Sequence, residues 1–298
     1  MNNGKKRLIK IACWVLGALL VTGFVIYKRT PGVPKQKTGA DGVTVRYLSL
    51  PNGEYTGGSV LGFLNGTGTF TFDTGEIYEG QWQYHEMSGQ GTLTSSEGVY
   101  EGEYVRSMRS GTGTFLWKDG SKYFGQWEAD KLCGKGEVTT ASQLSYKGTF
   151  QDNMLYEGKV SGIYNGNSFE VAVENGKIAD QISVIFADGV TYFGDFIGPY
   201  FAGTGKMTFP GVGTYEGKFE LDQRSGYGVF TWEDGTEYDG EWIADVYHGY
   251  GTYTFSDGTS ITGTFQNGGL DGTYTYKNSD GEFKTVWENG KCTSIEAK

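Results

Sequence analysis

The residue types that most often carry catalysis or bind metals are few in this chain. Among 298 residues there are two histidines, His85 and His248, and three cysteines, Cys13, Cys133 and Cys292. A zinc site needs these residue types in a closely spaced cluster, and the sequence contains no such cluster. A serine nucleophile needs a base to activate it, and so few bases give no credible Ser-His-Asp set.

Two glycine motifs also deserve a chemical test. Gly-x-Gly recurs, but never as G-x-G-x-x-G at the start of a helix, so the context argues against a phosphate-binding loop. Acids of Asp-Gly pairs stand at Asp119, Asp188, Asp234, Asp257 and Asp280. Turn geometry explains these acids better than acid–base catalysis, and nothing around them forms a ligand cage, so they could bind calcium only weakly. We therefore expect no enzyme, no cofactor and no metal site.

The elements that position these residues come from a repeat of 23 residues. Its first position is aromatic in all but one unit, a glycine usually follows two positions later, and an aromatic residue usually follows two positions after that. The first position is occupied by Tyr100, Tyr123, Tyr146, Phe169, Tyr192, Tyr215, Tyr238 and Ile261. A fixed period of this length indicates an array built from one supersecondary unit.

The unit Tyr100–Lys122 predicts two short antiparallel strands. Its first five residues alternate between aromatic or glycine and glutamate, which is typical of a half-buried strand. A mostly polar stretch of six residues follows, which we interpret as the hairpin loop, and Gly111–Trp117 forms a second alternating strand. Asp119-Gly120 then predicts a tight turn into the next unit, because glycine accepts a positive φ.

Glycines at positions 3, 12 and 14 of the unit weaken a strand locally. Their recurrence suggests that aromatic rings from neighbouring strands lie over bare backbone. One such hairpin is not stable in water, so stacking of units must supply the stability.

The chain resembles the MORN-repeat family (membrane occupation and recognition nexus) in its pattern Tyr-x-Gly-x-aromatic, then Gly-x-Gly, then Asp-Gly. Examples are YEGEY…SGTGTFLWKDG, YEGKF…SGYGVFTWEDG and YDGEW…HGYGTYTFSDG, and the pattern extends from about Tyr55 to Gly281. The resemblance implies an all-β fold, an elongated, twisted antiparallel sheet of stacked hairpins; together with the apolar run near the N-terminus, it suggests a membrane-anchored, bacterial member of the family. It also implies an accessory or scaffolding role, because such repeats accompany catalytic machinery rather than form it.

Charge is distributed unevenly along the chain, whose formal net charge is −10. Residues 1–37 contain 8 lysines and arginines and no acid, which leaves 17 bases against 35 acids in the remainder. Nucleic acid needs a positive surface, so we expect no nucleic-acid partner. The acidic array also argues against lying flat on anionic lipid.

A basic tail, residues 1–10, precedes an uncharged apolar run, residues 11–27. At about 1.5 Å per residue this run can just cross a bilayer core, and we predict one transmembrane helix rather than a cleaved signal peptide. Basic residues flank the run on both sides, so the positive-inside rule barely decides the orientation. We expect a single-pass protein of the cell membrane, with the N-terminus in the cytoplasm and the repeats outside.

We predict a linker over residues 28–42, a repeat array over 43–291 and a tail over 292–298. The two units between Tyr146 and Thr191 lose the glycine pair, which predicts either a bend that separates two lobes or mere drift of the repeat. Cys133 and Cys292 are about seven units apart, too far for a disulfide. An edge strand at either end of the array could pair with another copy of the chain.

The tenth position of each unit is apolar more often than a loop position should be. It suggests a ridge along one edge of the array: Met87, Met108, Leu132, Leu155, Ile178, Phe201, Tyr247 and Leu270, with Met108 standing beside Arg109. The ridge either binds a partner or is buried where neighbouring loops pack together. The aromatic face is an alternative surface that we expect to be core: Tyr104, Trp127, Phe150, Phe219 and Trp242.

These features lead to three hypotheses of function. The first is a membrane-anchored, non-enzymatic scaffold that binds an unknown protein partner at the membrane surface. The second is a module that binds lipid headgroups or tethers membranes. The third is a binder of cell-wall carbohydrate, which a ladder of exposed tryptophans or tyrosines would favour.

Overall fold

The computed structural model describes residues 32–38, 40, 44–164, 166–198 and 200–297. None of these residues is helical, and the fold is all-β with 24 strands. No helix among the described residues is long and apolar enough to cross a membrane. The apolar run 11–27, predicted as a transmembrane helix, lies outside the described residues.

The array divides into two compact units. The N-terminal unit contains the described residues up to Ser161 together with Val173–Lys177, and the C-terminal unit contains Gly162–Ala172 and Ile178 onward. The division falls within the two divergent repeats, for which the sequence left open a bend between two lobes or mere drift of the repeat.

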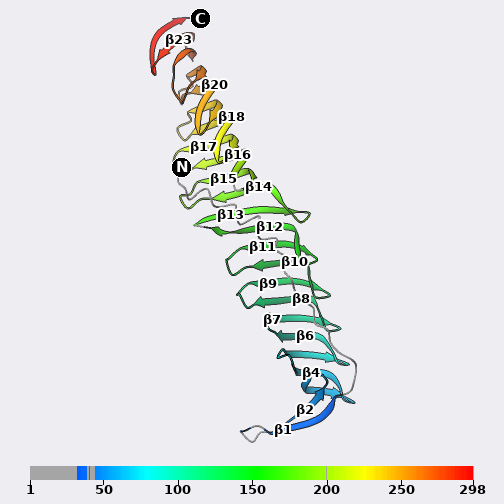
Figure 1. Cartoon of the computed structure of the whole chain (residues 1–298). Helices are drawn as coiled ribbons and strands as arrows, with labels where there is room; N and C mark the ends of the chain where they lie inside the picture. The colour runs from blue at the N-terminus through cyan, green and yellow to red at the C-terminus, as the bar shows by residue number, and fades with distance from the viewer. Residues whose placement is uncertain (1–31, 39, 41–43, 165, 199, 298) are drawn as a thin grey trace. The chain divides into compact units, whose positions relative to one another are not determined.

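Strands follow one another along each unit, and consecutive strands pair in antiparallel fashion, as β1 does with β2, β7 with β8 and β17 with β18 (Figure 1). The strands up to the division are β1 (Val33–Thr38), β2 (Thr44–Leu50), β3 (Gly53–Val60), β4 (Phe63–Phe72), β5 (Ile77–Gln83), β6 (Glu86–Thr94), β7 (Gly98–Val105), β8 (Met108–Trp117), β9 (Lys122–Glu128), β10 (Lys131–Thr139), β11 (Ser145–Gln151) and β12 (Met154–Tyr164). The remaining strands are β13 (Asn167–Glu174), β14 (Lys177–Ile185), β15 (Thr191–Ile197), β16 (Tyr200–Phe209), β17 (Gly213–Glu220), β18 (Gln223–Trp232), β19 (Glu237–Ile243), β20 (Val246–Thr254), β21 (Ser260–Phe265), β22 (Gly272–Asn278), β23 (Gly281–Glu288) and β24 (Lys291–Ala297).

Both ends of the predicted array need correction. Part of the expected linker is strand β1, whose residues Val33–Thr38 pair with β2. Most of the expected tail is strand β24, which pairs with β23. Both stretches are short and polar, and it is pairing with a neighbouring strand that makes them extended.

Outside the divergent repeats, a typical unit is a hairpin whose glycine pair lies under a tyrosine. Gly102 faces Gly113 across β7 and β8, and a Cβ added to Gly113 would lie 2.3 Å from the Tyr100 hydroxyl oxygen. That hydroxyl donates to the carbonyl of Glu103 at 3.1 Å. The expected ring over bare backbone is therefore confirmed, except that the ring comes from position 1 of the same strand as Gly102.

The tyrosines at position 1 and the rings at position 5 form an edge-to-face ladder that is the core of each unit. Tyr100 contacts Tyr104 of its own hairpin and Trp127 of the next hairpin, both with ring centroids 5.2 Å apart. Tyr215 makes the same two contacts with Phe219 and Trp242, at 5.1 and 5.2 Å. This geometry is favourable for aromatic quadrupoles, so each hairpin is stabilised chiefly by its neighbours.

The ladder changes where the sequence departs from the repeat. Tyr146 is buried, but the structure gives its hydroxyl no hydrogen-bond partner, and burial raises the pKa of Tyr146 to about 12. The next repeat has Phe169, Val171 and Val173 at positions 1, 3 and 5, all buried. An aliphatic core there replaces the tyrosine–glycine stack.

Candidate interaction surface

The predicted ridge lies beside two-residue turns. The turns occupy positions 7 and 8 of the repeat, and wherever the structure describes both of these residues they have positive φ, as at Arg106 (51°) and Ser107 (68°). Tight hairpins favour this conformation because its twist matches that of the flanking strands. The six-residue loop predicted from the sequence is therefore wrong, and position 10 belongs to a strand.

Neighbouring turns are joined by reciprocal hydrogen bonds at position 10. The backbone N–H of Met87 donates to the Ser107 hydroxyl at 3.0 Å, and the N–H of Ser107 donates to the Met87 carbonyl at 2.9 Å. The same exchange joins Leu132 to Asn153, with an N–H to side-chain distance of 2.8 Å. This turn ladder pulls the residue at position 10 against the next hairpin.

The ridge residues consequently do not form a continuous exposed surface. Met87, Leu132, Leu155 and Phe201 are buried in the core. Ile178, Tyr247 and Leu270 are half-buried, and Met108 is 38 % exposed. Packing of adjacent turns, one of the two readings of this pattern, accounts for their apolar character.

Two arginines occupy position 10 in place of an apolar residue. Arg109 is buried; its Nε donates to Asp130 Oδ1 at 2.9 Å, and its guanidinium lies 4.6 Å from the Trp127 ring centroid. Arg224 repeats the arrangement with Asp245 at 3.1 Å and Trp242 at 4.4 Å. Each arginine is thus held between an aromatic ring and a carboxylate.

The candidate chemical residues have structural partners. His85 is buried in a turn, where its Nδ1 accepts from the Leu64 N–H at 3.3 Å. Asp234 and Asp257 accept backbone N–H groups two residues later, as turn-forming aspartates do. Cys133 and Cys292 are free thiols. Among the described residues no group of three acids, histidines or cysteines could hold a metal ion.

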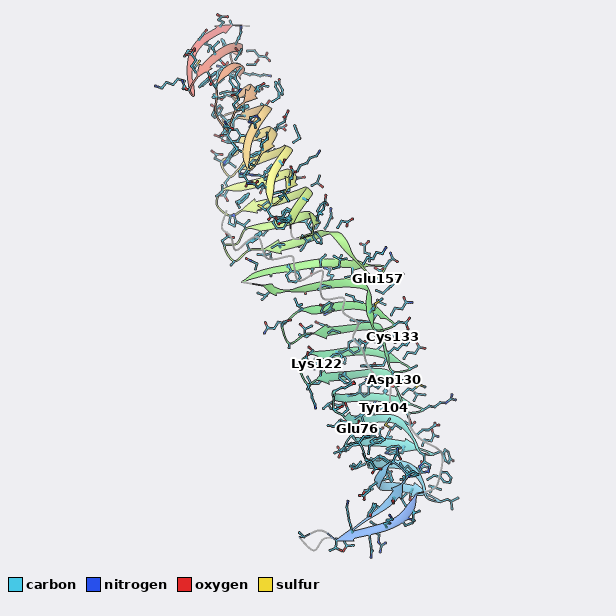
Figure 2. All side chains as sticks on the ribbon, viewed as in Figure 1. Glu76, Tyr104, Lys122, Asp130, Cys133 and Glu157 are labelled. Atoms are coloured by element: carbon cyan, nitrogen blue, oxygen red, sulfur yellow. The ribbon has the colours of Figure 1, made fainter. Side chains whose placement is uncertain are left out.

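The sheet of each compact unit therefore has two different faces. The aromatic face is core, as predicted, with Tyr104, Trp127, Phe150, Phe219 and Trp242 all buried. The opposite face, which we call the outer face, contains positions 2 and 4 of the first strand and positions 13, 15 and 17 of the second. In Figure 2 the labelled Asp130 lies along the edge with the two-residue turns, and Lys122 and Glu76 lie along the other edge.

In the N-terminal unit the outer face is acidic and has few exposed apolar side chains. Glu79, Glu101 and Glu103 point outward from β5 and β7. Leu116 and Phe124, on neighbouring strands β8 and β9, are its largest exposed apolar side chains in this region.

The outer face of the C-terminal unit combines acids with exposed tyrosines. Tyr227 on β18 and Tyr250 on β20 are 57 % and 62 % exposed. Asp239 and Glu241 lie on the intervening strand β19, with Glu241 directly opposite Tyr227. We call these four residues the outer tyrosine patch. A shallow hollow beside it is lined by residues that include Glu216, Val229, Thr231 and Trp232.

The comparisons with known proteins agree with this architecture. The model of the MORN repeat matches six segments: 55–77, 78–99, 100–122, 123–143, 215–237 and 238–260. This chain is a MORN-repeat protein. The segments are four consecutive repeats in the N-terminal unit and two in the C-terminal unit, on either side of the divergent repeats.

No curated protein matches the MORN-repeat protein. Among solved structures it is similar to one described as "Streptogramin B lyase structure", at 12 % identity over 84 % of each chain, with a TM-score of 0.13. A score this low supports no conclusion about the fold or activity of this chain.

Sequence reasoning missed the outer tyrosine patch of this MORN-repeat protein. The signal was present, because position 13 is otherwise polar at Gln90, Thr112, Lys135 and Thr204 but is tyrosine in two successive repeats. The search for apolar periodicity instead selected position 10, whose regular apolar character reflects burial.

Proposed function

We propose that this MORN-repeat protein is a non-enzymatic, membrane-anchored scaffold that holds a protein partner at the membrane surface. MORN repeats generally mediate interactions with proteins or with membrane lipids. The observation that supports the choice of a protein is the division between the two faces. The aromatic face is occupied by self-packing, which leaves an outer face of carboxylates and isolated exposed rings for recognition.

The acidic character of the outer face argues against lipid as the main ligand. Anionic headgroups attract lysine and arginine, whereas the side chains here include the exposed Glu79, Glu101 and Glu241 and the half-buried Asp239. A neutral carbohydrate is a second candidate, favoured by Tyr227 and Tyr250. Three tryptophans that could have formed a sugar-stacking ladder, Trp82, Trp127 and Trp242, are instead buried.

The proposed topology has one anchor, residues 11–27, with the repeats outside the cell. Protease added to intact cells should remove the array and leave a fragment containing the basic tail. Protection of the array until the cells are broken would contradict this orientation and leave the scaffold on the cytoplasmic side.

Cross-linking of the full-length chain in its own membrane tests the scaffold. We expect one or a few proteins to be recovered reproducibly, and recovery of none would contradict the proposal.

Footprinting of the full-length chain in neutral and in anionic proteoliposomes tests the lipid alternative. We expect equal labelling of the outer face in both, and protection confined to anionic vesicles would favour lipid binding.

A further inference from the structure

The outer tyrosine patch has the geometry of a site for two cationic side chains. Tyr227 and Tyr250 lie two strands apart, which places their backbones about 10 Å from each other at ~4.8 Å per strand. Between them, Asp239 accepts a hydrogen bond from the Tyr227 hydroxyl. The Glu241 carboxylate lies over Gly249, where an added Cβ would meet its Oε2 at 2.4 Å.

Glu241 differs from the residues at the same position of other repeats. In four repeats the position-4 side chain accepts the N–H of position 13: Gln81 from Gln90 at 3.0 Å, Glu103 from Thr112 at 3.0 Å, Gln126 from Lys135 at 2.8 Å and Asp195 from Thr204 at 2.8 Å. The structure gives no such bond between Glu241 and Tyr250 within the residues that it describes. The carboxylate therefore remains available to a ligand beside two exposed rings.

The charge of the residues around the outer tyrosine patch favours a cationic ligand. Residues 215–260 contain ten acids and only two bases, Lys218 and Arg224. Arg224 is already paired with Asp245 on the core side. Lys218 lies over Gly226 beside Tyr227, so a cationic segment would meet one like charge against several carboxylates.

The chain itself shows how such a ligand would be bound. Arg109 and Arg224 each lie over aromatic rings while donating to an aspartate, and the same two groups, ring and carboxylate, are presented to solvent in the outer tyrosine patch. Cations are attracted to the faces of tyrosine rings, and a neighbouring carboxylate adds a charge-assisted hydrogen bond. An extended segment can place two arginines or lysines across a 10 Å separation.

We propose that the outer tyrosine patch, Tyr227, Asp239, Glu241 and Tyr250, is the docking site for an extended, arginine- or lysine-rich segment of the partner protein. This inference rests on the proposed scaffold function and specifies the chemistry of the segment that is recognised.

Fluorescence anisotropy on the purified full-length chain tests the proposal. The probe is a labelled dodecapeptide of alternating arginine and serine, and the neutral reference has citrulline in place of arginine. We expect the arginine peptide to bind at least tenfold more tightly than the citrulline peptide at 50 mM NaCl, and less tightly at 300 mM because salt screens exposed charges. Equal binding of the two peptides would overturn the proposal.

Variants locate the site. Tyr227→Ser with Tyr250→Ser, and separately Asp239→Asn with Glu241→Gln, should each weaken the arginine peptide at least fivefold. The matched control, Glu101→Gln with Glu103→Gln, removes two charges from the equivalent positions of the N-terminal unit and should change binding less than twofold. Equal weakening by the control would show a diffuse charge effect and overturn the site.

Two further outcomes separate the alternatives. If an N-acetylglucosamine tetramer binds in a manner that needs Tyr227 and Tyr250 while the arginine peptide does not, the patch is a carbohydrate site and the proposal is wrong. If cross-linking recovers the same partner with wild type and with both double variants, the scaffold stands and only this docking site is wrong.

Discussion

The contact between a tyrosine side chain and two facing glycines explains why these residue types recur in the repeat. The Tyr100 side chain covers Gly102 and Gly113, and its hydroxyl donates to the Glu103 carbonyl. Any larger residue at either glycine must displace the ring or the opposite strand. The glycines are therefore retained for space rather than for backbone freedom.

Gly113→Ala should destabilise the chain by about 2 kcal/mol, the usual cost of overpacking a tight core. Gly120 provides a control, because no atom lies within 4 Å of its added Cβ although its φ is +88°. Gly120→Ala should cost about 1 kcal/mol, from φ alone. Urea unfolding followed by circular dichroism measures both, and equal costs would argue against the steric explanation.

The buried Arg109–Asp130 pair predicts a larger effect. Asp130→Ala leaves a guanidinium without its carboxylate among aromatic rings and should cost about 3 kcal/mol. Lys131 pairs with Asp152 on the surface, where solvent screens the pair, so Lys131→Ala should leave Tm nearly unchanged. Thermal unfolding of both variants tests this, and similar shifts in Tm would contradict the assignment of Arg109 to the core.

At the scale of the hairpin, a bulge capped by the position-4 side chain recurs along the sheet. Asp195 accepts the Thr204 N–H at 2.8 Å and the Thr204 hydroxyl at 2.9 Å. The Thr204 backbone N–H and then the Gln181 amide hold the pKa of Asp195 below its usual value. Gln81 makes the corresponding backbone bond without a charge.

This difference predicts pH dependence at the Asp195 bulge and none at the Gln81 bulge. Because the folded-state pKa of Asp195 is depressed, its stabilising contribution is complete above about pH 4 and is lost as the pH falls through the folded pKa. Asp195→Ala should cost about 1 kcal/mol at pH 7 and less at pH 3, whereas the cost of Gln81→Ala should be the same at both. Unfolding curves at the two pH values would refute the bulge-cap account if both variants behaved alike.

The hairpins were predictable from sequence, but their turns were not. Alternation in YEGEY and the Asp119-Gly120 signal are local properties of the sequence. The strands and the Asp-Gly turns between repeats could therefore be predicted directly. The short turns contain pairs such as Arg106-Ser107 and Ala129-Asp130, which lack the Asn-Gly preference of this turn type. The positive φ of these turn residues is supported by hydrogen bonds to the neighbouring turn. The sequence of one repeat does not show which turn lies beside it, so this support could not be predicted.

The same reasoning explains the error about position 10. The sequence placed these apolar residues in a loop and left open whether they form a partner-binding ridge or are buried by packing of neighbouring loops; the turn ladder instead makes position 10 part of a strand. The polar acceptors at position 8, including Ser107, Asp130 and Asn153, were the missed indication that neighbouring turns bond to one another.

At the scale of the whole molecule, the array should tolerate changes in the number of repeats. Each hairpin contacts mainly its neighbours, so stability is approximately a sum over repeats. Deletion of Tyr100–Lys122 joins Val99 to Tyr123 in the same register and should leave a folded protein with a slightly lower Tm. Deletion of Tyr100–Gly111 instead breaks the register and should yield an aggregated chain. Circular dichroism and size-exclusion chromatography distinguish them, and equal behaviour would contradict the repeat assignment.

Membrane anchoring and the location of the repeats outside the cell remain predictions from residues 1–37, as does pairing of an edge strand with another copy. What the array contributes to the proposed function is an outer face on each of its two units, and the chemistry of that face differs between them. Only the C-terminal unit combines acids with two exposed tyrosines in successive repeats.

Hydroxyl-radical footprinting of the full-length chain, with mass spectrometry of each tyrosine, tests the central claim most directly. The claim is that the aromatic face is consumed by self-packing and that recognition belongs to the outer face. Tyr227 and Tyr250 should be labelled at least tenfold faster than Tyr78, Tyr123 and Tyr215, and the arginine peptide should protect only the first two. Comparable labelling of all five, or protection of the buried set, would contradict the account.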